Sequence, residues 1–292
     1  MTTLSNDIET RPLVWSVRRE LWENRSIYLA PPAVAAVVLL GFVISTFGMP
    51  ARRSAALLFD PAHQRAAIER PFDVAAIMLL LTAFLVGLFY CLDALYGERR
   101  DRSILFWKSL PVSDRTTVLA KAGIPLVILP LLTFVTTLIT QLLMLLWSTV
   151  VLLPSGLAAT TWTRVPWLQN SLVLLYSLIA IALWHAPIYG WMLLVSAWAR
   201  RATLLWAVLP LLAIGFLEKI AFNSRHFAFM LRNRLIGFFD QAFASKPHGT
   251  IDSLSQLTPG RFLSAPGLWI GLIFAAVFLA AAVRLRRYRE PI

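Results

Sequence analysis

Charged residues are scarce in this chain, and so are the residue types that build metal centres. Of its 292 residues, 14% are charged and 58% are hydrophobic, whereas a soluble domain carries about 25% charged residues. This balance excludes an ordinary soluble domain and is typical of a membrane protein. The single cysteine, Cys91, lies inside an apolar run, so it can form neither an intrachain disulfide nor a cysteine-based metal site.

Motifs for nucleotide binding and for catalysis are also missing from the sequence. A phosphate-binding loop needs Gly-x-x-x-x-Gly-Lys-Ser/Thr, and the chain contains no Gly-Lys pair. An intramembrane enzyme would need a Gly-x-Ser-x-Gly serine, a His-Glu-x-x-His pair or two aspartates at membrane depth, and none is present. We therefore expect no enzymatic activity, no bound cofactor and no metal in this chain.

The positive charges do not indicate nucleic-acid binding, although the formal net charge is +12. Clustered Lys and Arg on a soluble segment would neutralise phosphates. Here most arginines flank apolar runs, where they can reach lipid headgroups and set the topology. The distribution favours a membrane partner over DNA or RNA.

Six apolar runs are long enough to cross a hydrocarbon layer of ~30 Å. They lie at 27–48, 73–94, 122–151, 169–197, 202–222 and 266–283. We therefore expect an all-α integral membrane protein in which residues 1–292 form a single transmembrane domain.

Loop charges predict the orientation of these spans. Sixteen of the 27 Lys and Arg residues fall on the side that holds both termini. Most of the others fall in two longer segments, 49–71 and 223–265, and longer segments weigh less in the positive-inside rule. We expect both termini in the cytosol. Residues 1–26 are too polar for the apolar core of a signal peptide, so we expect the amino-terminal segment to be retained.

Residues 12–25 have the pattern of an amphipathic helix that rests at the membrane interface. Pro12 suits a first helical position. One side of the helix gathers Leu13, Val14, Trp15, Val17, Leu21 and Trp22. Arg19, Glu20 and Glu23 lie opposite, and Arg18 and Arg25 can extend to headgroups.

The segment between the second and third spans, GERRDRSILFWKSLPVSDR, runs from Gly97 to Arg115. Alternating charges precede an unbroken Ile-Leu-Phe-Trp run. Pro111 then disfavours a helix at Leu110, and Ser113 can cap the helix of the third span. A short helix with Phe106 and Trp107 beside charges suits a protein interface, because such interfaces use aromatic anchors ringed by charge. A helix lying on the membrane surface explains the same pattern.

With its SLPVS run, capped helix and Lys121, this segment resembles the coupling region of type-two ABC exporter permeases. The resemblance covers essentially the whole chain: an interfacial elbow helix, six spans, a coupling helix between spans two and three, and a short extracytoplasmic element before the sixth. Many relatives have Ser-Gly-Thr before the Leu-Pro-Val-Ser run. This sequence has Arg102-Ser103-Ile104 there, so its substrate cannot be inferred from the family.

The resemblance implies a permease driven by separate ABC ATPase subunits, which would bind the ATP and Mg. It further implies a second permease copy, identical or different, and a place in the bacterial cytoplasmic (inner) membrane. The residues that would contact the ATPase are Glu98, Arg99, Arg100, Asp101, Arg102, Phe106, Trp107 and Lys108. A self-sufficient secondary transporter and a non-transport membrane scaffold are the alternatives, although no internal repeat is visible to favour the former.

A polar face on the third span is a second candidate site. Thr133, Thr137, Thr140 and Gln141 are spaced three or four apart or adjacent, so they share one helical face. Hydroxyl and amide groups in a membrane are expected to face other helices or an aqueous path. The face predicts either helix packing or a lining of the translocation route.

Three further features leave alternatives open. His185, near Pro187 in the fourth span, is either functional or bonded to a freed backbone carbonyl. Gly267 and Gly271 form a weak Gly-x-x-x-Gly signal for a dimer seam. Residues 223–265 have the pattern of amphipathic helices at the outer surface, either over the mouth of the permease or on headgroups.

Overall fold

The computed structural model describes residues 12–109, 112–244 and 254–288. Within these ranges the chain is helical, and no β-strand is formed. The longest helices are α2 (Ser26–Ser45), α4 (Pro61–Ala94), α8 (Leu129–Leu152), α10 (Trp167–Trp198), α11 (Thr203–Phe222) and α15 (Pro266–Tyr288). The shorter ones are α1 (Pro12–Glu23), α3 (Met49–Ala56), α5 (Tyr96–Arg100), α6 (Ile104–Ser109), α7 (Asp114–Gly123), α9 (Ala158–Arg164), α12 (His226–Ile236), α13 (Phe238–Ala242) and α14 (Pro259–Ser264). A π-helical turn, η1 (Ile124–Ile128), joins α7 to α8, and 3₁₀ turns occur at Leu153–Ser155 and Leu254–Gln256.

The prediction of six helices long and apolar enough to cross a membrane is confirmed. The second and third of them are longer than their apolar runs, at His63–Arg100 and Asp114–Ser155. α4 begins at Pro61, in a polar stretch where Arg65 and Glu69 form an i,i+4 ion pair at 2.9 Å. Hydropathy detects only the apolar part of such a helix, so the sequence placed this span's start too late.

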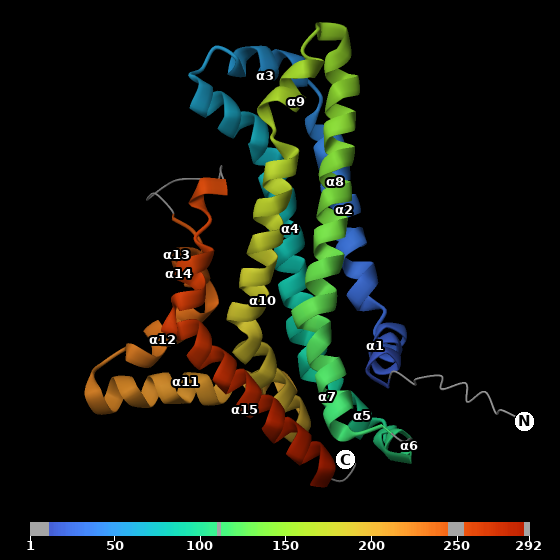
Figure 1. The fold of residues 1–292 in the computed structure, drawn as a ribbon, viewed down its shortest axis with the longest axis vertical. Helices are drawn as coiled ribbons and strands as arrows, with labels where there is room; N and C mark the ends of the chain where they lie inside the picture. Colours follow the sequence, from blue (N-terminus) through green and yellow to red (C-terminus); the bar gives the residue numbers. More distant parts are fainter. Residues whose placement is uncertain (1–11, 110–111, 245–253, 289–292) are drawn as a thin grey trace, which may run out of the picture.

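Four of these helices, α2, α4, α8 and α10, lie side by side along the long axis of the molecule (Figure 1). One apolar cluster among them includes Ile27, Tyr90 and Leu193. Another, further along, includes Phe72 and Met144. We call the end where α1, α5, α6 and α7 gather the charged end, and the end that carries α3 and α9 the distal end (Figure 1).

The α11 helix departs from this arrangement. Figure 1 shows it lying across the direction of α4, α8 and α10. Ala202, with φ of 50°, makes a left-handed turn directly before α11. Only 6% of its most apolar window is buried, against 50% for α10, so its apolar side chains face the surroundings on nearly every side.

Three short helices, α12, α13 and α14, lie between α11 and α15. Their predicted place at the outer surface stays a prediction. They lie beside α10, at the level where α15 begins (Figure 1). Phe238, Phe243 and Phe262 are buried around Trp184 of α10. The segments of α13 and α14 thus pack apolar residues against the chain itself, whereas α12 buries none of its residues. The stretch 245–253 lies outside the described residues.

Gly267 and Gly271 form a seam within the chain. The ring of Trp184 lies 3.4 Å from where a Cβ of Gly267 would be, and the guanidinium of Arg234 occupies the space beside Gly271. Arg234 donates to the carbonyl oxygens of Trp184, at 3.2 Å, and Gly267, at 2.8 Å. The two glycines thus admit intrachain side chains here, and the dimer seam stays a prediction.

Candidate functional site

Buried charges from four helices meet at the charged end. Lys121 of α7 donates to both carboxylate oxygens of Glu20 in α1, each at 2.9 Å, and lies 3.1 Å from Glu98 of α5. Arg286, near the end of α15, pairs with Glu98 and, at 3.1 Å, with Asp114. We call these five residues the ion network; all but Asp114 are at most 6% exposed.

Two more side chains extend the ion network. The hydroxyl of Tyr90 donates to Glu20 at 2.7 Å from within α4. Arg19 donates to Glu20 at 2.6 Å and to Glu98 at 2.8 Å, and its guanidinium lies 4.1 Å from the ring centre of Trp107 in α6. The network thus connects α1, α4, α5, α7 and α15, and reaches α6 through a cation–π contact.

The pKa values of two carboxyl groups of α1, Glu20 and Glu23, are shifted in opposite directions. Burial would raise the pKa of Glu20, but the positive charges of Lys121 and Arg19 outweigh it, so the pKa lies below the ordinary 4.5. Glu23 is approached only by Arg19, at 3.7 Å. For Glu23, the effect of burial outweighs the attraction of Arg19, so the pKa of Glu23 is raised. The network therefore holds Glu20 ionised.

A second set of contacts fixes α5 on the end of α10. Arg99 is 3% exposed and donates to the carbonyl oxygens of Ala197, at 2.7 Å, and Ala199, at 3.1 Å. Ser196 accepts from the backbone N–H groups of Leu95 and Tyr96. Because the last carbonyls of a helix have no partner within the helix, Arg99 completes α10 and anchors α5.

Seven of the eight predicted ATPase-contact residues divide into a buried and an exposed group. Glu98 and Arg99 are buried and have intrachain partners. Phe106 is 60% exposed. Arg100, Asp101, Arg102 and Lys108 are exposed as well.

Trp107, a member of the same prediction, takes an intermediate position. It is partly buried, with its ring under Arg19 and its edge against Phe106, at 4.9 Å between ring centres. The exposed apolar surface of α6 is therefore made by Leu105 and the aromatic Phe106, each 60% exposed. Charged side chains surround it. We call Leu105 and Phe106 the α6 surface.

Local sequence explains how α6 is presented. Arg102, with φ of 57°, turns the chain after α5. Ile104, 2% exposed, then inserts into the protein and leaves Leu105 and Phe106 outside. On the far side, Ser113 caps α7 by accepting from the N–H of Thr116 at 3.1 Å, as the sequence predicted. Residues 110–111 lie outside the described part of the chain.

The polar face of the third span is buried. Thr133, Thr137 and Thr140 donate to carbonyl oxygens one turn earlier in their own helix, and Gln141 donates to the carbonyl of Phe72 at 3.3 Å. These bonds satisfy the polar groups without water. The geometry is that of helix packing. That these residues line a translocation route stays a prediction.

His185 of α10 lies against α12. Its two ring nitrogens face the carbonyl oxygens of Ile181, at 2.9 Å, and Leu235, at 3.0 Å. No group of three or more His, Cys, Asp or Glu suited to a metal occurs among the residues the structure describes. His185 thus ties α12 to α10.

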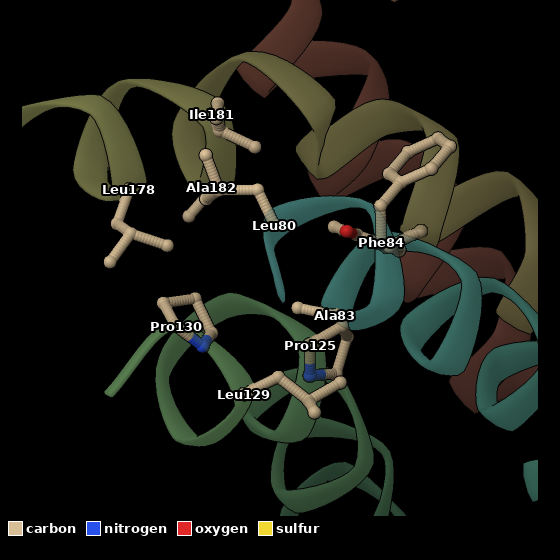
Figure 2. Close-up of a pocket in the computed structure, with 10 residues that line it drawn as sticks. Leu80, Ala83, Phe84, Pro125, Leu129, Pro130, Leu178, Ile181 and Ala182 are labelled. Atoms are coloured by element: carbon tan, nitrogen blue, oxygen red, sulfur yellow. The ribbon is translucent and has the colours of Figure 1, made fainter. Parts of the chain in front are cut away.

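A small crevice lies between α4, η1, α8 and α10 (Figure 2). Pro125 of the π-helical turn and Pro130 of α8 line one side of it, and Phe84 and Ile181 line it from the other helices. The side chain of Tyr189 is its one polar contribution. The lining suits hydrocarbon, and it offers no partner to an ionised ligand.

Sequence reasoning missed Arg19, Glu20, Asp114 and Arg286 as members of the site. Each is an ordinary charge next to an apolar run. The available signal was Lys121, a cation at the start of an otherwise apolar stretch and three residues before the π-helical turn begins, because a buried cation requires a carboxylate.

No family model, curated protein or solved structure matches this chain.

Proposed function

We propose that the chain is the membrane-spanning subunit of an ATP-driven exporter, and that separate ATPase subunits dock on the α6 surface. The observation that carries the proposal is the exposure of Leu105 and Phe106 on a short helix that is anchored on both sides. Exposed aromatic residues ringed by charge are typical of interface cores. The absence of a phosphate-binding loop from the sequence is consistent with a motor on another chain.

The ion network supports the proposal because it gives α6 a mechanical connection to the spans. Trp107 touches Arg19, Arg19 binds Glu98, and Glu98 binds Arg286 of α15. A rigid displacement of α6 would therefore act on α1, α7 and α15 together. In this proposal the charged end faces the cytosol, in keeping with the positive-inside distribution.

The route itself would be completed by a second permease copy, identical or different. Thr133, Thr137, Thr140 and Gln141 remain the predicted lining, which would open only if α8 moved away from α2 and α4. The bacterial inner membrane is the proposed location. ATP and Mg belong to the partner subunits.

The rival proposal of a self-sufficient secondary transporter has less support. Such proteins place ionisable groups near the middle of the membrane. The buried carboxylates Glu20 and Glu98 lie at the charged end, where they are neutralised by Lys121 and Arg286. Fixed ion pairs of this kind are poor candidates for proton coupling.

The experiment is the recovery of an ABC ATPase with the purified chain. Leu105→Ala combined with Phe106→Ala should reduce the recovered ATPase more than tenfold, because truncating a buried interface anchor costs ~2 kcal/mol or more. Phe59→Ala is the matched control, since Phe59 is 57% exposed at the distal end. Undiminished recovery with the double variant, or no ATPase with the wild type, contradicts the proposal.

A further inference from the structure

On the surface of a soluble protein, an amphipathic helix turns its charged side outward. The α1 helix instead buries a charged residue and exposes large apolar ones. Its charged Glu20 is 1% exposed and faces the protein interior. Val17 and Leu21 pack against the apolar core. Several of its other apolar residues, in contrast, point away: Val14 is 57% exposed, Trp15 59% and Trp22 64%. Such a face is stable in water only if something apolar covers it.

Arg18 stands in the middle of this outward face. Its guanidinium lies 5.4 Å from the ring centre of Trp15 and 4.7 Å from that of Trp22. Among the described residues no carboxylate pairs with Arg18, in contrast to its neighbour Arg19. The guanidinium is therefore held between two indoles with its N–H groups available.

The position of α1 directly before a candidate membrane span indicates that α1 lies at the membrane surface. α2, an apolar helix of 20 residues that is long enough to span a membrane, begins at Ser26, directly after α1. Arg25, also exposed, lies between α1 and α2, seven residues after Arg18. Trp15, Arg18 and Trp22 thus form a stripe of aromatic and cationic residues at headgroup level, and Arg25 lies just beyond the end of the helix.

We propose that Trp15, Arg18 and Trp22 form a binding site for the phosphate of an anionic phospholipid. The planar guanidinium can donate two parallel hydrogen bonds to a phosphate. The indoles hold it in place and bury their rings among the upper acyl carbons, and Arg25 adds a second positive charge. This site is independent of the exporter assignment, because it needs no ATPase.

The test measures lipid selectivity of the purified chain in bilayer nanodiscs. Spin-labelled phosphatidylglycerol and spin-labelled phosphatidylcholine are compared for the fraction immobilised on the protein. The wild type should prefer phosphatidylglycerol. Arg18→Ala should lower this preference about fivefold, because it removes a cation held in place by two indoles together with its forked hydrogen bonds to phosphate. Arg18→Lys should restore only part of it, since an ammonium keeps the charge but not the fork.

Arg284→Ala is the matched control, because Arg284 is an exposed arginine at the charged end without flanking indoles; it should leave the preference close to that of the wild type. Equal losses for Arg18→Ala and Arg284→Ala would reduce the effect to general electrostatics and overturn the site. A separate arm adds inorganic phosphate at constant ionic strength, which should not displace the labelled lipid. Displacement of the labelled lipid by inorganic phosphate would show that the site binds free phosphate and not a lipid headgroup. Unchanged lipid selectivity of Arg18→Ala together with loss of a co-purifying protein would assign the face to a protein partner.

Discussion

α5 and α6 follow one another in the chain and share a mixture of charged and aromatic residues, yet their surroundings are opposite. Glu98 and Arg99 of α5 are 6% and 3% exposed and are bound to other helices. Leu105 and Phe106 of α6 are 60% exposed. Residues of α5 should therefore govern the stability of the fold, whereas residues of the α6 surface should govern binding.

The largest effect is expected where the network is broken from inside. Lys121→Met removes the buried ammonium that binds Glu20 and Glu98 and leaves Arg19 as the cation that both carboxylates share. Removing one partner of a buried ion pair costs ~3–5 kcal/mol. Chemical denaturation of the detergent-solubilised protein should show a loss of that size. Lys108→Met, an exposed lysine on α6, is the control and should change stability by less than about 0.5 kcal/mol. Similar losses of unfolding free energy for both variants would contradict the claim that the buried network, and not the exposed residues of α6, stabilises the fold.

A smaller effect is expected from pH. Because the network lowers the pKa of Glu20, its contribution to stability is fully present above the ordinary pKa of 4.5 and is lost as the pH falls through the lowered value. Glu20→Gln should be less stable than the wild type at pH 7 and should lose less stability on acidification. Thermal unfolding midpoints between neutral and acidic pH give the measurement. An identical acid dependence in the variant would show that other groups are responsible.

The smallest effect is expected from the charges around α6. Arg100→Glu with Arg102→Glu should weaken ATPase recovery only a few fold, because solvated rim charges are screened by salt. The unfolding free energy should stay within about 0.5 kcal/mol of the wild type. Recovery measured at low and high ionic strength tests the idea, since a loss that persists at high salt contradicts an electrostatic rim.

Much of the fold could be predicted from the sequence because apolar length determines a span. Each of the six apolar runs became a helix. The direction of α11 could not be predicted, since length and hydropathy are the same for a helix that crosses the bundle axis and one that follows it. The early start of α4 was missed because residues 61–72 are helical without being apolar.

The candidate site was predicted only in part, and α1 shows the physical reason. A helical pattern separates Trp15 and Trp22 from Glu20, but it does not say which face meets the protein. In a membrane both faces have a suitable partner: lipid for the indoles, and Lys121 for the carboxylate. Trp107, which was predicted to be an interface anchor, lies partly against Arg19. Its contact depends on α1, far away in the sequence.

The central claim, that the α6 surface docks a protein and not lipid, is tested most directly by cross-linking. A photoreactive phenylalanine analogue is placed at Phe106 and, in a second variant, at Phe59 as a control of equal exposure at the distal end. The account predicts that position 106 cross-links to an ABC ATPase in native membranes and that position 59 does not. Cross-links from position 106 to lipid alone would contradict it.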